Sequence, residues 1–274
     1  MKFFFLLLPL IAFSQKTPED FGLRHLVFTY KNDTVDVIIE SKKGEETKAK
    51  PLFFWCQGSL PQPIIKYDER GLFPVFPFDS KDFLNDFHLV IIAKPAIPVI
   101  ADVKNLKKNY CVLDEKGNVP LAYSDRNYLD YYADRNNFII SKLLSNPIFL
   151  KKNLIVAGHS EGSHIAARMA CTNKKIAGLI YSGGNPYGRF LNIVAQSRME
   201  ENDNTIFDYW SDVVVNKNDK TYNGGDTYNC TYGFSEPLVD KIEKLKIPVY
   251  VAYGTKDYNV AYMDLFYTDV LRKN

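Results

Sequence analysis

The residues best suited to do chemistry lie in the segment Gly158-His159-Ser160-Glu161-Gly162. An apolar run precedes it at 154–157, and a run of small residues with a helical pattern follows at 163–170. This order predicts a strand, a sharp turn and a helix, with the serine at the apex of the turn. Glycine is expected on both sides, because a larger side chain would collide with so tight a bend. The spacing therefore favours an exposed, nucleophilic Ser160, and an ordinary strand-to-helix turn is the alternative.

On this motif and its flanking elements, the chain resembles the α/β-hydrolase family, and the resemblance covers most of the sequence after residue 24. It implies an α/β fold with a mostly parallel sheet, helices on both faces of the sheet, and a lid-like insertion over the active site. It also implies a two-step reaction in which Ser160 attacks an acyl carbonyl and water then releases the acyl-enzyme. No metal or organic cofactor is expected for this reaction.

The family order of the catalytic triad is serine, acid, histidine, which places the acid after a later strand. Residues 248–253 have the pattern of that strand, and Gly254-Thr255-Lys256-Asp257 follows directly. Asp257 is the expected acid, which would orient an imidazole and stabilise its charged form. Its competing role is to cap the helix that begins just after it. Asp208 and Asp212 are weaker candidates, because no strand precedes them.

The implied oxyanion hole needs two backbone N–H groups, and the loss of one donor typically costs about 3–4 kcal/mol in the transition state. Glu161, the residue after the nucleophile, is expected to supply one. The other is expected from the turn after a strand at 52–56, which reads Gln57-Gly58-Ser59. Relatives often have His-Gly at this turn, so Gln57 departs from the pattern. Because the donor belongs to the backbone, we still expect the Ser59 N–H to serve.

The triad histidine is absent from its expected place. The chain has four histidines, and none follows Asp257. A general base must come within about 3 Å of the serine hydroxyl. His25 and His88 begin early strands, the His159 side chain leaves the turn in another direction, and His164 lies one turn into the next helix. The catalytic histidine is therefore not expected among these residues.

Three explanations for the missing histidine stay open. The first is a C-terminally truncated chain that lacks the final strand and the histidine loop, which we favour because the open sheet edge would be apolar. The second is a non-catalytic hydrolase fold that kept its serine turn. The third is an unusual base, His88 or His164.

The elements around these residues alternate between strands and helices, which predicts a mostly parallel sheet. Strands are expected at 25–30, 34–41, 52–56, 88–93, 154–157, 176–181 and 247–253. Helices are expected at 127–145, after the elbow serine, and at 260–271. Continuous apolar runs are typical of strands that are covered on both faces.

The periodicity breaks down between about 184 and 241, where aromatic residues are scattered among polar ones. The resemblance implies that this insertion is a lid over the active site. The alternative is a solvated surface segment whose aromatic residues pack on each other. Asp219 and Asp226 lack the spacing of a known calcium loop.

The composition limits the possible partners. The 34 basic and 32 acidic residues are well mixed and give a net charge of +2, so nucleic acid is not an expected partner. A chain of 274 residues with 46% hydrophobic residues can bury one large core, so residues 15–274 are expected to form a single domain with an elaboration.

The first fourteen residues have the pattern of a signal peptide. A lysine precedes an apolar run at 3–13, and the small residues Ala12 and Ser14 stand where a signal peptidase reads. The run is shorter than the about 20 residues of a membrane span, so no membrane span is expected. We expect a secreted or periplasmic protein that begins near Gln15, and a buried first strand is the alternative.

Export would permit disulfides among the four cysteines. Cys56 on an apolar strand and Cys171 at the end of a helix are typical of small buried residues. Cys111 and Cys230 lie in polar, loop-like surroundings and form the more favoured pair. No spacing of cysteine and histidine indicates a zinc site.

Together these features predict an exported serine hydrolase that acts on a small-molecule ester or a peptide. Exported members of the family include carboxylesterases, sugar-ester deacetylases and prolyl-oligopeptidase-like peptidases. An ester is favoured because no accessory domain is present to gate a peptide. A binding protein on the same scaffold is the rival class, and the sequence does not indicate an oligomeric state.

Overall fold

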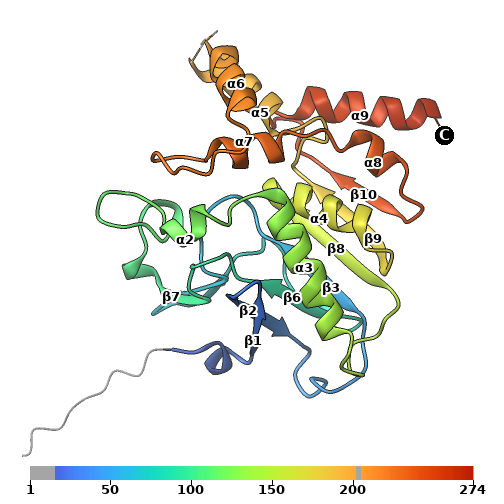
Figure 1. Cartoon of the computed structure of the whole chain (residues 1–274). Coiled ribbons are helices and arrows are strands. Elements are labelled where there is room, and N and C mark those ends of the chain that lie inside the picture. The colour runs from blue at the N-terminus through green and yellow to red at the C-terminus, as the bar shows by residue number, and fades with distance from the viewer. Residues whose placement is uncertain (1–15, 202–204, 274) are drawn as a thin grey trace, which may run out of the picture.

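The computed structural model describes residues 16–201 and 205–273, so the predicted signal peptide at 1–14 lies outside the described residues. Its centre is a seven-stranded sheet in the spatial order β1-β2-β6-β3-β8-β9-β10 (Figure 1). The strands are β1 (Arg24–Tyr30), β2 (Asp33–Glu40), β3 (Leu52–Cys56), β6 (His88–Ile92), β8 (Leu154–His159), β9 (Ile176–Ser182) and β10 (Val249–Ala252). All seven predicted strands are confirmed, with small differences at their ends.

The pairing of the strands is mixed at one edge and parallel elsewhere. β1 and β2 form an antiparallel hairpin, and β2 is also antiparallel to β6. The neighbours from β6 to β10 are all parallel. Every residue of β3 and β6 is buried, as expected for parallel strands that are covered on both faces.

One face of the sheet is covered by helices. α3 (Leu129–Leu143) and α4 (Glu161–Thr172) bury Ile139, Ile140 and Met169 in the larger of two hydrophobic cores. α8 (Val239–Glu243) and α9 (Val260–Lys273) extend this core towards β10. The predicted helices at 127–145, after Ser160 and at 260–271 are thereby confirmed.

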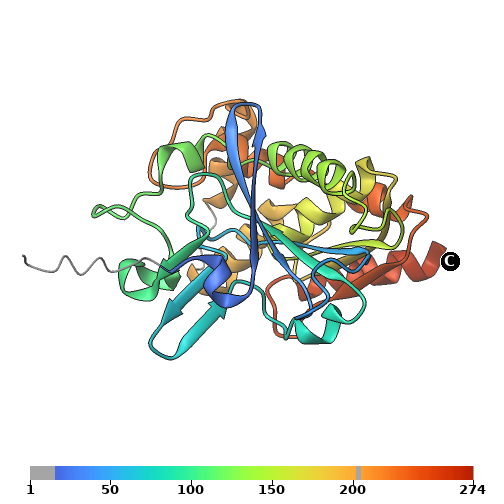
Figure 2. The ribbon, with the colours of Figure 1, turned by 90° about the horizontal axis from the view of Figure 1, so that it is seen from below.

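The other face is covered mainly by a second, three-stranded sheet in the order β5-β4-β7. Its strands are β4 (Ile65–Asp68), β5 (Gly71–Pro74) and β7 (Ile100–Asp102). The helices here are short, α1 (Lys81–Leu84) and the 3₁₀ turn η1 (Pro18–Phe21). Figure 2 shows α3 and the β4–β5 hairpin on opposite sides of the central strands.

Large aromatic side chains explain why this second face needs no long helix. The ring of Phe53 on β3 lies 4.7 Å from that of Phe83 and 6.0 Å from those of Phe78 and Phe87. These rings bury the sheet in place of a longer helix. Helices on both faces are therefore present, but on this face the small sheet does most of the covering. The sequence pattern did not predict the small sheet.

The insertion at 184–241 is largely helical, which its irregular pattern did not predict. It contains α5 (Arg189–Gln196), a π-helical turn (Ser197–Glu201), α6 (Ile206–Val215), α7 (Tyr228–Phe234) and α8. Figure 1 shows α5, α6 and α7 grouped together above the body of the protein. The Trp210 ring stacks on Phe190 at 4.4 Å and on Tyr232 at 6.2 Å. The aromatic residues thus pack on each other, and this packing holds the three helices together.

The favoured disulfide between Cys111 and Cys230 is not formed, since all four cysteines are free thiols and all four lie in the described ranges. Cys111 Sγ contacts the carbonyl oxygen of Asn109 at 3.7 Å. Cys230 is buried and lies in α7 rather than in a loop. The helix begins before Cys230 because the Thr227 side chain caps it by accepting the Cys230 N–H at 3.1 Å. Across the described ranges, no helix has the length and hydrophobicity that crossing a bilayer requires.

Phe53→Ala tests the aromatic layer of the second face. Phe53 is 2% exposed, so its loss should leave a cavity and lower the free energy of unfolding by about 3–5 kcal/mol. Phe73→Ala makes the same chemical change at a position that is 36% exposed, and should cost less than about 1 kcal/mol. Urea unfolding followed by circular dichroism compares the two variants. Equal losses would contradict the packing described.

Candidate nucleophilic site

Ser160 stands at the bend between β8 and α4, with φ 55° and ψ −126°. A residue with a side chain rarely adopts this conformation, and such strain persists where the surrounding structure enforces it. The Ser160 N–H donates to the Ser182 carbonyl at 2.9 Å, and the Ser163 hydroxyl donates to the Ser160 carbonyl at 2.6 Å. Ser160 is partly exposed, and in the described part of the chain its Oγ forms no hydrogen bond. The hydroxyl is therefore held at the surface of the bend without an internal partner.

The two glycines of the motif are required by close backbone contacts. A Cβ atom on Gly158 would lie 2.1 Å from the Gly162 carbonyl oxygen. A Cβ atom on Gly162 would lie 2.2 Å from the Cys56 carbonyl oxygen. Both distances are far below any van der Waals contact, so the bend excludes a larger residue at either position, as the motif predicts.

The two expected oxyanion donors lie beside this bend. Cys56 at the end of β3 pairs with Gly158 of β8, which brings the following turn next to Ser160. A Cβ atom on Gly58 would lie only 3.9 Å from Ser160 Cβ. Over residues 16–201 and 205–273, neither the Ser59 N–H nor the Glu161 N–H donates a hydrogen bond. Both groups are thus free to bind an oxygen that gains negative charge.

A chain of four charges lies next to these donors; Lys94 and Glu161 are buried, Arg189 is partly exposed and Asp226 is exposed. Lys94 Nζ is 3.4 Å from Glu161 Oε1, and Arg189 Nη1 is 3.3 Å from Glu161 Oε2. The same guanidinium pairs with Asp226 of the insertion. Burial lowers the pKa of Lys94, although the charge of Glu161 opposes this shift. Burial also acts to lower the pKa of Arg189, but the charges of Asp226 and Glu161 outweigh it and raise that pKa.

These ion pairs fix the insertion against the bend, because Arg189 begins α5 and Glu161 begins α4. The sequence analysis missed Lys94 and Arg189. They belong to no local motif, and only the fold brings them to Glu161. Asp226 pairs with Arg189, and the carboxylate of Asp219 accepts the Thr221 N–H at 2.8 Å. Within the described ranges, no group of acidic, histidine and cysteine residues could hold a metal ion.

A cavity of about 240 Å³ opens beside the buried charges. Its wall combines the oxyanion turn, two tyrosines and polar residues of the insertion. The residues that line it include Ser59, Tyr123, Asn127, Arg189, Tyr222 and Asp226. Because Ser59 belongs to this wall, the cavity is the candidate for substrate binding.

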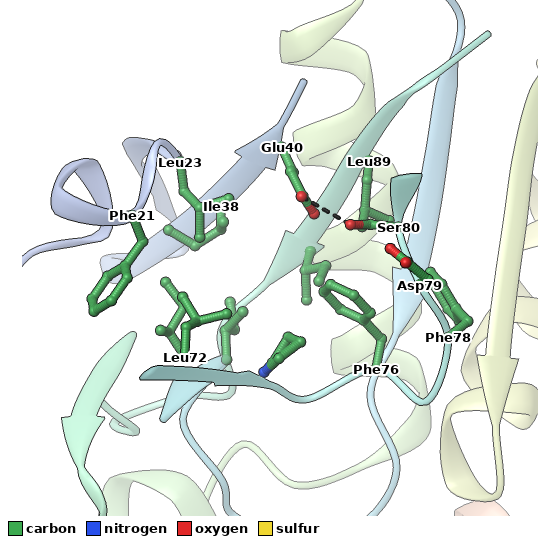
Figure 3. A pocket seen from close by; sticks show the side chains of 14 residues that line it. Phe21, Leu23, Ile38, Glu40, Leu72, Phe76, Phe78, Asp79, Ser80 and Leu89 are labelled. Carbon is green, nitrogen blue, oxygen red and sulfur yellow. Dashed lines mark hydrogen bonds between the residues drawn. The ribbon is translucent and has the colours of Figure 1, made fainter. Parts of the chain in front are cut away.

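A second cavity, of about 150 Å³, lies between the central sheet and the small sheet (Figure 3). Phe21, Leu72 and Phe76 line it, and the Ser80 hydroxyl donates to Glu40 at 2.8 Å. Burial raises the pKa of Glu40, and the Ser80 bond opposes this. None of the candidate site residues lines this cavity, so it is not part of the nucleophilic site.

Asp257 lies in the loop between β10 and α9, where the acid was expected. Its carboxylate accepts the Asn259 N–H at 2.9 Å, and its carbonyl accepts the Val260 N–H at 3.0 Å. These bonds form the turn that leads into α9, whose first residue is Val260, so Asp257 shapes the entry to the helix but is not its N-cap residue. Ala252 and His159 both pair with Ser182 in parallel ladders, so the Asp257 loop leaves the sheet at the same edge as the serine bend. The two weaker candidates, Asp208 and Asp212, are exposed on α6.

None of the four histidines, all of which lie in the described ranges, forms a hydrogen bond with the Ser160 hydroxyl. His159 is exposed, and its Nδ1 lies 3.1 Å from Ser182 Oγ. His25 pairs with Asp36 at 2.8 Å on the β1–β2 hairpin. These two side chains therefore point to other partners.

The two unusual bases considered above are also engaged elsewhere. His164 is buried, its Nε2 donates to the Asn185 carbonyl at 2.9 Å, and burial lowers its pKa to about 4. His88 is buried between the Ser41 hydroxyl at 2.7 Å and the Lys48 carbonyl at 2.9 Å. The His164 ring also faces the Ser160 backbone, but in the described residues neither ring forms a hydrogen bond with the Ser160 hydroxyl.

Comparisons with known proteins agree on the architecture. No protein-family model matches the chain, and no curated protein matches it in sequence. An acylaminoacyl peptidase from Pyrococcus horikoshii is 16% identical with a TM-score of 0.55, over 92% of this chain and 35% of the peptidase. The chain has the α/β-hydrolase fold. The chain spans about a third of the length of that peptidase.

Two esterases share this fold over more of their own length. An esterase from Pyrococcus furiosus is 12% identical with a TM-score of 0.53, over 94% of this chain and 81% of the esterase. Acetyl xylan esterase 1 from Thermoanaerobacterium is 11% identical with a TM-score of 0.51, over 90% of this chain and 73% of the esterase. At these identities the likeness concerns the fold.

Gly162→Ala tests the crowding of the bend. The added methyl group would meet the Cys56 and Gln57 carbonyls, so the free energy of unfolding should fall by at least about 1–3 kcal/mol. Gly233→Ala on α7 is the control, because nothing lies within 4 Å of its Cβ position. It should be neutral or stabilise by up to about 1 kcal/mol. Urea unfolding measures both variants, and a harmless Gly162→Ala would show that the bend is not crowded.

The buried His164 predicts a pH dependence of stability. Its pKa falls from 6.5 in the unfolded chain to about 4 in the folded protein, so the unfolded state binds the proton first as the pH drops. Between pH 7 and pH 4.5 the wild type should lose roughly 2–3 kcal/mol of stability through this group. His164→Gln should lack this part of the loss in urea unfolding. An identical pH dependence in both proteins would contradict a neutral, buried His164.

Proposed function

We propose that the protein is an exported serine hydrolase that cleaves an ester bond through an acyl-enzyme on Ser160. The observation that carries the proposal is the strained, partly exposed Ser160 beside two backbone N–H groups without internal partners. The fold supports it, because solved structures with this fold include esterases and peptidases. Export rests on the pattern of residues 1–14.

In the proposed reaction, Ser160 Oγ attacks the carbonyl carbon of the ester. The electron pair of the carbonyl moves to its oxygen, which the N–H groups of Ser59 and Glu161 then bind. A general base takes the serine proton and passes it to the leaving alcohol. Water repeats the sequence on the acyl-enzyme and releases the acid. The oxyanion donors act mainly in the transition states, so they accelerate the reaction rather than tighten ground-state binding.

The general base is the part of this mechanism that the described residues do not supply. The proposed base is an imidazole that reaches the serine bend from the side of Asp257. Asp257 leaves the sheet at the edge of the serine bend and would orient that imidazole. The charge of Asp257 would also stabilise the imidazolium that forms during the reaction.

The candidate cavity favours a small ester over a long peptide. Its volume of about 240 Å³ holds a small acyl or alcohol group, and Tyr123 and Tyr222 give it aromatic walls. Peptide cleavage is the second choice within the enzymes, and the similarity to an acylaminoacyl peptidase concerns only 35% of that protein.

One observation favours the rival class, a non-catalytic binding protein. The Asp257 carboxylate is already bonded to the Asn259 N–H, and within the described residues no histidine ring bonds the Ser160 hydroxyl. In a binding protein the bend would survive as a structural turn. The two experiments below separate the classes.

The protein made from the complete gene should react with a fluorophosphonate and hydrolyse p-nitrophenyl acetate. Ser160→Ala should abolish both reactions, because an activated serine displaces fluoride from the reagent and becomes phosphonylated. Ser211→Ala removes an exposed hydroxyl on α6 and should change neither. Gel fluorescence and absorbance record the two results. A folded wild type that neither reacts nor hydrolyses would favour the binding protein.

Asp257→Asn separates catalysis from the turn that precedes α9. Asparagine keeps an oxygen for the Asn259 N–H but loses the charge, so kcat should fall by about 10⁴-fold, the loss typical of this change in a triad acid. The free energy of unfolding should change by less than about 0.5 kcal/mol. Asp257→Ala should lose the same activity and a further ~1 kcal/mol of stability, because the Asn259 N–H loses its acceptor. Full activity of the asparagine variant would leave Asp257 with the structural role alone.

A further inference from the structure

We propose that Lys94 is a positioning residue that assembles the oxyanion hole by holding its two donor residues in place. The proposal rests on the proposed function of Ser160 as the nucleophile. Lys94 follows β6, so it belongs to neither the serine bend nor the turn after β3. Its role is visible only in the three-dimensional contacts.

One ammonium group joins the two sides of the oxyanion hole. Lys94 Nζ donates to the Ser59 carbonyl oxygen at 3.1 Å and to Glu161 Oε1 at 3.4 Å. Ser59 and Glu161 are the two residues whose N–H groups flank Ser160. The spacing between the donors is thus tied to a single buried side chain.

The Ser59 side of the hole is fixed by three hydrogen bonds. Besides Lys94, the Tyr123 hydroxyl donates to the Ser59 carbonyl at 2.9 Å. On the other side, the Gln57 amide donates to the Ile92 carbonyl at 2.8 Å. Because the Gln57 side chain and the Ser59 carbonyl are both anchored, the backbone between them keeps one orientation, and the Ser59 N–H with it. Gln57, which departs from the family pattern, therefore has a structural role at this turn.

The Glu161 side is fixed through its carboxylate. Oε1 accepts from Lys94 and Oε2 from Arg189, so both oxygens of this buried side chain have a cationic partner. Glu161 is the first residue of α4, and holding its side chain restrains the start of the helix and its N–H. Donors held in advance need no reorganisation when charge develops on the substrate oxygen.

The surroundings of Lys94 argue against a simple stabilising role. Lys94 is 4% exposed, and its ammonium lies 5.5 Å from the Tyr123 ring centre and 5.4 Å from that of Tyr132. A buried ion pair is often no more stable than the hydrophobic residues that could replace it. In the described residues Lys94 forms no hydrogen bond with Ser160 Oγ, so it does not act as the base. What remains is the geometry that it imposes on Ser59 and Glu161.

The test compares two buried lysines that each donate to one backbone carbonyl and pair with one glutamate. Lys50 is 3% exposed, donates to the Leu84 carbonyl at 2.6 Å and pairs with Glu45 at 2.6 Å. Its location before β3 places it at the opposite end of that strand from Ser59. Lys94→Met and Lys50→Met therefore remove equivalent interactions, and both should lose stability.

The two variants should differ in catalysis. Measured on the full-length protein with p-nitrophenyl acetate, kcat per fluorophosphonate-titrated site should fall about 10²-fold in Lys94→Met, close to the loss of one oxyanion donor. KM should change less than about 3-fold, because the hole binds the transition state rather than the substrate. The inhibition constant of a trifluoromethyl ketone, a mimic of the tetrahedral intermediate, should rise by a similar factor to the fall in kcat. Lys50→Met should keep the wild-type kcat and inhibition constant.

An unchanged kcat per titrated site in Lys94→Met would overturn the proposal while leaving Ser160 as the nucleophile. A wild type that is not labelled at Ser160 would overturn the proposed function, and this inference with it. If Lys94→Met does not fold, Lys94→Gln decides, since its neutral amide can still donate to Ser59. It should show a fall of about 10-fold in kcat, and wild-type values in this variant would overturn the proposal.

Discussion

The candidate site depends on one steric constraint, the close approach of the end of β3, the end of β8 and the start of α4 around Ser160. Gly158 and Gly162 lie so close to each other and to the end of β3 that a methyl group fits at neither position. The backbone can turn from strand to helix in this space only by placing Ser160 at a positive φ. This conformation directs the hydroxyl away from both elements. Ser160 is therefore held at the apex of the bend, partly exposed, by the packing of its neighbours.

The same approach brings the other candidate groups together. The parallel strands β3, β6, β8, β9 and β10 end at one edge of the sheet, and the loops that follow them carry Ser59, Lys94 and Asp257. Buried ion pairs then connect these loops to the insertion through Glu161 and Arg189. Each of these residues is distant from the others in sequence. Their association follows from the sheet topology alone.

Local patterns were sufficient to predict the elements of the central sheet. Apolar runs identified β3, β6 and β8, and the paired glycines identified the bend at Ser160, because both signals depend on neighbouring residues. The small sheet β5-β4-β7 was missed, since its strands are short and are stabilised by rings such as Phe53 from another element. The helices of the insertion were missed because they are short and are held together by stacking around Trp210, although α5 has a short apolar stripe through Phe190 and Val194.

The candidate site could be predicted only in part, because some of its residues are brought together only by contacts between distant segments. Ser160, Glu161, Ser59 and Asp257 each belong to a motif or follow a strand, so the sequence and the family resemblance indicate them. Lys94 and Arg189 have no such local signal, and the pattern could not show that Asp257 bonds the Asn259 N–H in the turn before α9. Partners of buried charges are determined by tertiary structure, which a single sequence does not display.

The most direct test of the central claim is a rapid-quench experiment with p-nitrophenyl acetate on the full-length protein. A nucleophilic Ser160 predicts a burst of one p-nitrophenolate per protein molecule, and mass spectrometry should find one acetyl group on the peptide that contains Ser160. Steady hydrolysis without a burst and without acetyl-Ser160, or an acetyl group on another residue, would contradict the account.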